Sequence, residues 1–223
     1  MKKLFALVAL CVATVGASAQ SEVGTFSLQP KIGFNVSFLT NAGKTVLDVP
    51  GGPMTGNRDV KAGFVAGVEA EYQITPVISV AAGLLYSIQG TRWEDLETIG
   101  EGYRYMSKDH MFDLSYLNIP IVANFYVAKG FALKAGVQPG FLLDSKEKET
   151  YCDAQNREVK ASDDIEGIKK FDLSIPLGAS YEFNNVVIDA RYNLGLTKVC
   201  SGDENKAAKN SVIQVTVGYK FAL

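Results

Sequence analysis

Apolar and polar residues alternate with a period of two along most of the chain. The clearest case runs from Ser211 to Leu223, where every second residue from Ile213 onward is a large apolar one. Because successive side chains of a strand point to opposite faces, this pattern predicts a strand with one apolar face and one mainly polar face. An apolar strand at the end of a soluble protein would be an aggregation-prone edge, whereas in a closed transmembrane barrel it is the ordinary last strand.

The same alternation recurs and predicts eight strands, at 26–38, 62–73, 77–90, 112–127, 131–143, 170–183, 186–197 and 211–223. Tight turns at 74–76, 128–130 and 184–185 alternate with long polar connections at 39–61, 91–111, 144–169 and 198–210. This asymmetry is typical of bacterial outer-membrane barrels, which have short periplasmic turns and long outside loops. We therefore expect an all-β, eight-stranded, antiparallel up-and-down transmembrane barrel with both termini on the periplasmic side.

Aromatic residues on the apolar faces are expected to form two belts at the ends of these strands. Phe26, Tyr72, Phe125, Phe131, Tyr181, Phe183, Tyr219 and Phe221 gather at one end, and Phe38, Phe64, Tyr86, Phe141, Phe171 and Tyr192 gather at the other. Such belts are typical of the two interfaces of a membrane barrel. The alternative is a soluble eight-stranded barrel of the lipocalin kind, whose apolar face points inward. The opposite face is rich in Gly, however, where a solvent face would carry more Lys and Glu.

Four prolines fall inside the predicted strands and cannot donate a hydrogen bond to a strand ladder. They are Pro30, Pro120, Pro139 and Pro176. We expect bulges or local breaks at these positions.

The N-terminal residues have the features of a secretory signal peptide. Lys2 and Lys3 precede an apolar stretch of about a dozen residues, and Ala17-Ser18-Ala19 is a small-x-small cleavage pattern. We expect cleavage after Ala19, which leaves residues 20–223 as a single barrel domain. Without the two signal lysines, 20 basic residues stand against 24 acidic ones, a formal charge of −4. This balance does not favour nucleic-acid binding, which needs a concentrated basic surface.

The polar face of the strands is expected to fill the lumen with paired charges. The predicted charge network consists of Lys31, Glu69, Glu71, Lys134, Asp172, Glu182, Asp189, Arg191 and Lys220. Eight strands enclose a space just wide enough to be filled by side chains, and charges removed from water must be paired. We therefore do not expect a wide diffusive pore in this barrel, and a narrow channel for small solutes or ions remains the alternative.

Cys152 and Cys200 remain after signal cleavage and lie in the third and fourth long loops. Those loops flank the tight hairpin at 184–185, and export passes through an oxidising compartment. We expect a Cys152–Cys200 disulfide, with two free thiols as the alternative.

His110 is the single histidine and stands close to Ser107 and Asp109 in the second long loop. A membrane acyltransferase could use such a trio, but a lone histidine in a polar loop is more often a surface residue. The sequence has no zinc-like spacing, no phosphate-binding loop and no nucleophile elbow. We expect a non-enzymatic protein without metal or cofactor.

The long outside loops are the candidate binding surface, because loops on a rigid scaffold often carry function. The second loop adds Trp93 and Tyr103-Arg104-Tyr105 as a possible anchor group, and the third is dense in charges of both signs. Basic residues near the outer rim are candidates for contact with lipopolysaccharide phosphates: Arg58, Lys61, Arg92, Lys169 and Lys170.

The chain resembles the small outer-membrane β-barrel "porin family", or PorT-like, proteins that are common in Bacteroidetes. The resemblance covers about residues 21–223 and is carried by Tyr116-Leu117-Asn118-Ile119-Pro120-Ile121, Gly136-Val137-Gln138-Pro139-Gly140 and Val217-Gly218-Tyr219-Lys220-Phe221. The family commonly has an acid at the position of Asn118 and a terminal aromatic at that of Leu223. The resemblance implies outer-membrane location more than transport.

These features lead us to expect an integral outer-membrane protein with a structural or surface-interaction role. Its partners would be outer-membrane lipid, lipopolysaccharide and an envelope protein. The alternating Tyr219, Phe221 and Leu223 resemble the C-terminal signal that the outer-membrane assembly machinery recognises, so we expect that machinery to be a partner during insertion.

Overall fold

The computed structural model of the protein describes residues 22–40, 45–47, 52–100, 103–152, 157–165, 167–199 and 208–223. Among these residues, no helix has the length and hydropathy needed to cross a membrane. The predicted signal peptide, with its cleavage position after Ala19, lies outside the described residues.

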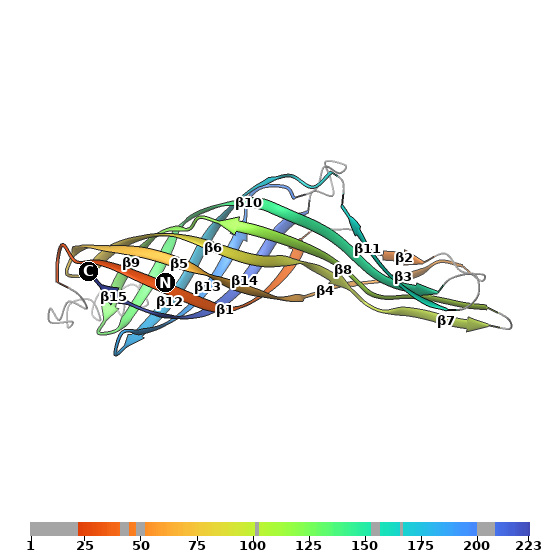
Figure 1. Ribbon diagram of the computed structural model, residues 1–223, viewed down its shortest axis with the longest axis horizontal. Coiled ribbons are helices and arrows are strands. Elements are labelled where there is room, and N and C mark those ends of the chain that lie inside the picture. The colour runs from red at the N-terminus through yellow and green to blue at the C-terminus, as the bar shows by residue number, and fades with distance from the viewer. Residues whose placement is uncertain are drawn as a thin grey trace, which may run out of the picture.

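Within the described residues, antiparallel strands form a closed ring with eight members, two of which consist of two consecutive strands. Figure 1 shows this barrel. In ring order the members are β1 (Phe26–Thr40), β5 (Lys61–Thr75), β6 (Ile78–Trp93), β8 (Tyr103–Asn118) continued by β9 (Ile121–Ala128), β10 (Phe131–Cys152), β12 (Phe171–Phe183), β13 (Val186–Gly195), and β14 (Lys209–Tyr219) continued by β15 (Phe221–Ala222). The ring closes where β14 and β15 pair with β1, with Lys31 opposite Gly218 and Leu28 opposite Phe221. The predicted eight-stranded barrel is confirmed.

Prolines interrupt the strand ladder, as expected for residues without an N–H group. Pro120 separates β8 from β9, and the preceding Ile119 donates its N–H to the carbonyl of Pro139 at 2.8 Å. Pro30 lies near the gap between β14 and β15, where Lys220 donates its N–H to the carbonyl of Asn185 at 2.8 Å. Two predicted strands are therefore each built from two segments.

Short turns join neighbouring strands at one end of the barrel, called here the hairpin end. The tightest turn is Asn184-Asn185 between β12 and β13, and both residues have positive φ, 49° and 67°. Two consecutive residues with positive φ are the signature of a type I′ turn, in which asparagine is favoured. The C-terminus lies at this same end (Figure 1).

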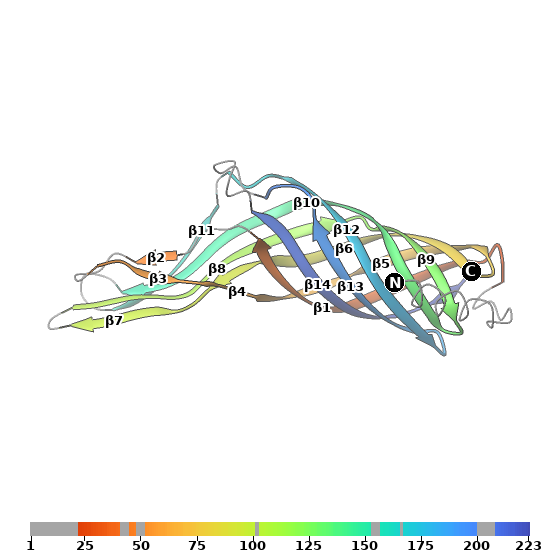
Figure 2. The ribbon, with the colours of Figure 1, turned by 180° about the vertical axis from the view of Figure 1, so that it is seen from behind.

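Four strands run far beyond the ring at the opposite end (Figures 1 and 2). This extension sheet consists of β11 (Glu158–Asp164), β10 from Asp144 onward, β8 up to Asp113, and β7 (Leu96–Gly100), paired in that order. The short strands β2 (Thr45–Leu47), β3 (Met54–Gly56) and β4 (Arg58–Asp59) also belong to this end.

The prediction of polar loops at 39–61, 91–111 and 144–169 is wrong in part, because much of these three segments is strand. The strands were not evident because charged residues occupy consecutive positions there, on both faces of the strand, as in Lys146-Glu147-Lys148-Glu149. An apolar–polar period arises only where one face is buried. The fourth predicted loop lies mostly outside the described residues.

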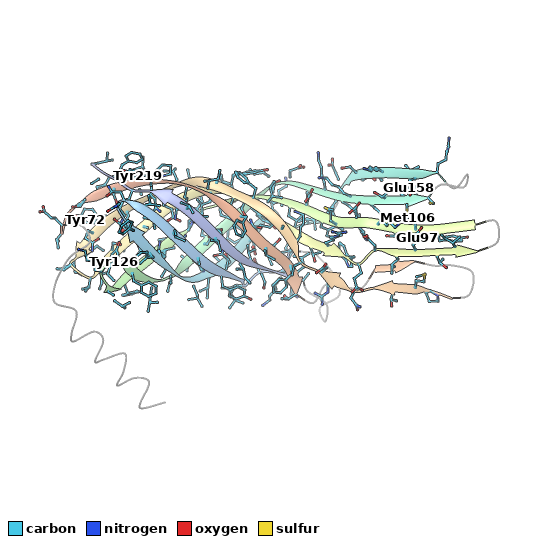
Figure 3. The ribbon with its side chains drawn as sticks, turned by 90° about the horizontal axis from the view of Figure 1, so that it is seen from below. Tyr72, Glu97, Met106, Tyr126, Glu158 and Tyr219 are labelled. Atoms are coloured by element: carbon cyan, nitrogen blue, oxygen red, sulfur yellow. The ribbon has the colours of Figure 1, made fainter. Side chains whose placement is uncertain are left out.

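The barrel's outer face is apolar and its inner face is polar, so the predicted direction of the two faces is confirmed. On β1, Ile32 and Phe34 are 57% and 61% exposed on the outside, whereas Lys31 and Asn35 are buried inside. The alternative of a soluble barrel with an apolar interior is therefore wrong. Tyr72, Tyr126 and Tyr219 mark the hairpin end in Figure 3, with Tyr126 on the inner face.

Candidate functional site

A buried ion cluster fills the lumen in the half nearer the hairpin end. Strand parity directs Lys31 of β1, Glu69 of β5, Lys134 of β10 and Asp189 with Arg191 of β13 inward. Arg191 forms a two-pronged pair with Glu69, at 2.6 and 2.8 Å, and also contacts Asp189 at 2.6 Å. Asp189 further binds Lys134 at 2.6 Å and Lys31 at 3.4 Å, and Lys31 binds Glu69 at 2.7 Å. Each charge is thus matched by at least one opposite charge, as burial requires.

A second charge group lies at the inner face of the last strand. The Nζ atom of Lys220 is 2.8 Å from Glu182 and 3.3 Å from Glu71. Glu71 also accepts hydrogen bonds from the hydroxyls of Tyr126 and Ser79. Across the two groups, four basic and four acidic side chains balance. The sequence did not point to Tyr126, which completes this group on the inner face while its neighbour Phe125 faces outward.

Asp172 is the member of the predicted network that the structure does not join to it. Its carboxylate accepts a hydrogen bond from the hydroxyl of Thr197, and no ion pair involves it among the described residues. The reason is position: Asp172 begins β12 at the far end of the barrel from Arg191 and Lys220. The sequence places it on the correct face but cannot specify its height in the lumen.

A layer of amide side chains lies next to the ion cluster, on the side of the extension sheet. Asn35 donates to Ser87 at 2.9 Å, Gln89 donates to Ser87 at 3.1 Å, and Asn210 donates to Gln89, which links β1, β6 and β14 across the lumen. Gln138 and Ser174 add a further pair between β10 and β12. These side chains carry no net charge.

An apolar cluster closes the lumen on the side of the extension. It consists of Leu39, Leu114, Tyr116, Val199 and Ala208, all buried, with Phe112, Leu142, Ile165 and Ile168 packed against it. The three layers can be followed along β1, where Lys31, Asn35 and Leu39 are inward-facing at intervals of four residues, or about 13 Å along the strand. The signal for this apolar cap was present in the sequence, since Phe38-Leu39 places apolar residues on both faces of the strand end.

A carboxylate shared by two lysines lies where the extension leaves the barrel. Asp113 is 2.6 Å from Nζ of Lys61 and 2.5 Å from Nζ of Lys148. Partial burial alone would raise the pKa of Asp113, but the hydrogen bonds from Lys148 and Lys61 outweigh it and lower the pKa below its ordinary value. Gly90 has φ of 133°, and a Cβ there would lie 1.9 Å from the carbonyl oxygen of Phe112, so only glycine permits this close approach.

Some of the basic residues at the rim that were candidates for lipopolysaccharide contact are paired with carboxylates. Lys61 is buried and paired with Asp113, and Arg92 lies 3.4 Å from Asp95 and 3.3 Å from Asp109. Lys169 and Lys170 are exposed. Contact with lipopolysaccharide phosphates stays a prediction for these residues and for Arg58, which is also exposed.

The residues considered for catalysis point to separate partners. His110 stacks on Trp93 with ring centroids 4.5 Å apart, and its Nε2 lies 2.7 Å from Glu147. Ser107 donates to Glu149 instead of to the histidine. The sequence trio is therefore not assembled as a hydrogen-bonded relay. In the described part of the chain, no group of three His, Cys, Asp or Glu side chains is arranged to hold a metal ion.

The predicted Cys152–Cys200 disulfide is not supported, because Cys152 has a free thiol at the tip of β10. Cys200 itself lies outside the described residues. Cys152 is ten residues farther along β10 than Leu142 of the apolar cap, about 33 Å in an extended strand. The sequence suggested neighbouring loops but did not show that β10 carries Cys152 away from the rim.

The three residues of the predicted insertion signal lie together on the outer surface at the hairpin end. Tyr219 and Phe221 pack with ring centroids 4.8 Å apart, on either side of the break at Lys220. Leu223 is exposed, and its N–H donates to the carbonyl of Phe26 at 2.9 Å. The C-terminal residues thus complete the seam between the last and first strands.

The sequence matches the family described as "Outer membrane protein beta-barrel domain" over residues 18–201. No curated protein matches it significantly. Among solved structures, Ail, the attachment invasion locus protein of Yersinia pestis, is 16% identical, with 90% of this chain and 100% of that chain covered and a TM-score of 0.43. Neisserial surface protein A is 16% identical (88% and 97% covered, TM-score 0.40), and OprG from Pseudomonas aeruginosa is 12% identical (92% and 100% covered, TM-score 0.44). These low values assign no activity to this chain.

Proposed function

Because this chain belongs to the outer membrane protein β-barrel domain family, we propose that it is a non-enzymatic surface-interaction protein of the outer membrane. The barrel is the anchor in the membrane, and the extension sheet is the binding element outside the cell. Within the family, the motifs around Asn118, Gln138 and Tyr219 favour the PorT-like group.

The observation that carries this proposal is the extension sheet itself. Its four strands stand beyond the ring, and their exposed side chains include Lys146, Lys148 and Lys160 with Asp163 and Asp164. Leu96, Met106 and Thr150 of this sheet are buried, but the charged side chains of β10 and β11 face water, where they are available for contact with another molecule.

The edge of this sheet indicates how a partner could bind. β11 pairs with β10 and, within the described residues, with no other strand. On its outer side, the backbone groups of an edge strand can accept an additional extended segment. Beside this edge lies a groove of about 330 Å³, lined by Met111, Lys148, Thr150, Lys160 and Ser162 among others, which could receive side chains of the partner.

We orient the protein with the hairpin end and both termini in the periplasm and the extension outside. The support is the difference in length between the two kinds of connection, because outer-membrane barrels combine short periplasmic turns with long outer segments. The C-terminus at the hairpin end agrees with this orientation.

Site-specific photocrosslinking on intact cells tests the proposal. A photoreactive residue at Ser162 of β11 should capture a partner, whereas one at Lys129, in the turn between β9 and β10, should not capture that partner. With the photoreactive residue kept at Ser162, deletion of residues 147–160 from the β10–β11 tip should abolish the capture while heat-modifiable migration shows an intact barrel. Equal capture at Ser162 and Lys129, or none at Ser162, would contradict the proposal.

A narrow channel is the second candidate function, and the polar lumen is the observation that favours it. Uncharged amides and paired charges line the barrel from Asn210 down to Lys220. Both the ion cluster and the apolar cap oppose passage, so this candidate ranks below surface interaction.

A further inference from the structure

The amide layer of the lumen contains buried polar atoms that the protein itself does not satisfy. Asn193 and Gln214 are 2% and 1% exposed, and in the described part of the chain neither the nitrogen nor the oxygen of either side-chain amide has a hydrogen-bond partner. Exchanging the nitrogen and the oxygen of either side-chain amide would not change this, because both atoms of each amide are unpartnered. Buried polar groups are almost always hydrogen-bonded, so something besides the protein binds these two amides.

Five of the other unpartnered atoms belong to buried side chains on the inner faces of β1, β8, β10 and β14. They are Asn35 Oδ1, Asn118 Nδ2, Gln138 Oε1, Asn210 Oδ1 and Thr216 Oγ1. Gln214 lies at the middle of this set, since it is the register partner of Asn35 on one side and of Arg191 on the other. The unpartnered atoms therefore border the ion cluster in the lumen, since Thr216 is likewise the register partner of Asp189.

The chemistry of these atoms identifies the ligand. Amide nitrogens and the hydroxyl can donate, amide oxygens can accept, and none of the groups is charged. An anion would need donors alone and a metal cation would need oxygen acceptors alone. Water both donates and accepts, and buried water typically forms about three hydrogen bonds to such groups.

Two barriers of different kinds close the amide layer off. Below it, Arg191, Glu69 and Lys31 form the ion cluster with side chains at most 2% exposed. Above it, Leu39 and Leu114 belong to the apolar cap and are 1% and 0% exposed. We propose that the amide layer is a water-binding site sealed by an ionic barrier on one side and an apolar barrier on the other. This inference does not depend on the role of the extension sheet.

Water-edited solid-state NMR of the labelled protein in lipid bilayers tests the water site directly. The side-chain NH₂ groups of Asn193 and Gln214 should receive magnetisation from water at short mixing times. The methyl groups of Leu114 in the apolar cap are the internal control and should receive at least tenfold less. Amide signals as weak as those of Leu114 would overturn the proposal.

Thiol accessibility tests the seals. In a Cys152→Ser, Cys200→Ser background, Asn193→Cys should react with a charged thiol reagent at least a hundredfold more slowly than Ser162→Cys on β11. Adding Leu39→Ala to the Asn193→Cys protein should speed its reaction at least tenfold, while Ser162→Cys reacts equally with and without Leu39→Ala. Two outcomes would show that the apolar barrier is not a seal. One is a fast reaction of Asn193→Cys behind the intact cap. The other is no acceleration by Leu39→Ala in a barrel that still shows heat-modifiable migration.

Discussion

Asp189 is the residue on which the balance of the buried ion cluster depends most. Its carboxylate contacts Lys134 and Arg191 at 2.6 Å and Lys31 at 3.4 Å. Without this charge, three buried cations would face the single carboxylate of Glu69. Removing one partner from a buried ion pair is costly because it leaves the other charge uncompensated in a medium of low polarity.

We predict that Asp189→Asn lowers the free energy of unfolding by about 3–5 kcal/mol. Asp172→Asn is the matched control, because Asp172 is also buried in the lumen but forms no ion pair among the described residues. It should cost about 2 kcal/mol or less. Urea unfolding of both variants in lipid vesicles measures the difference, and equal losses would show that the ion cluster contributes no special stability.

At the scale of elements, the last strand completes the seam of the barrel in two segments. β15 pairs with β1 through Ala222 opposite Ser27 and Phe221 opposite Leu28. Because of the break at Lys220, these few pairs are what holds the C-terminus against the first strand at the hairpin end. The same residues carry the outward-facing side chains that the assembly machinery is expected to recognise.

We predict that deleting Phe221–Leu223 reduces insertion into the outer membrane at least tenfold while export continues, so the protein accumulates in the periplasm. Fractionation and the heat-modifiable migration of the folded barrel measure insertion. Leu223→Phe, which restores the usual terminal aromatic, is the control and should insert at least as well as the native chain. Normal assembly of the truncated protein would refute the role assigned to the C-terminus.

The elements also show how far prediction from sequence reaches. All eight barrel strands were predicted, because each has one face toward the apolar outside and one toward a polar lumen, which imposes a period of two. β11 was missed because both of its faces are accessible to water, and β7 because its five residues are too few to show such a period. Asn184-Asn185 was recognised as a turn because asparagine tolerates positive φ.

At the scale of the whole molecule, the lumen has three successive layers, and two of them, the ion cluster and the apolar cap, oppose conduction. The ion cluster blocks it with paired charges, the amide layer binds polar molecules, and the apolar cap excludes them. The molecule thus combines an anchored, closed barrel with a protruding sheet (Figure 2).

We predict that the reconstituted native protein gives no large, steady conductance steps in planar bilayers. Heat-denatured protein added in the same detergent is the control for leakage caused by the preparation. Reproducible steady steps from the folded monomer alone would contradict the closed lumen and favour the channel as the function.

The sequence by itself determined the strands of the barrel, the direction of their faces and the residues that line the lumen, because these depend on the local alternation of side chains. Only the tertiary structure decided which lumen residues meet. Arg191 reaches Glu69 across 122 positions of sequence, whereas Asp172 lies at another height, and strand stagger around the ring sets both outcomes. The tertiary structure likewise showed the extension sheet and the distance of Cys152 from the rim, because pairing between β8 and β10 beyond the membrane leaves no apolar pattern in the chain.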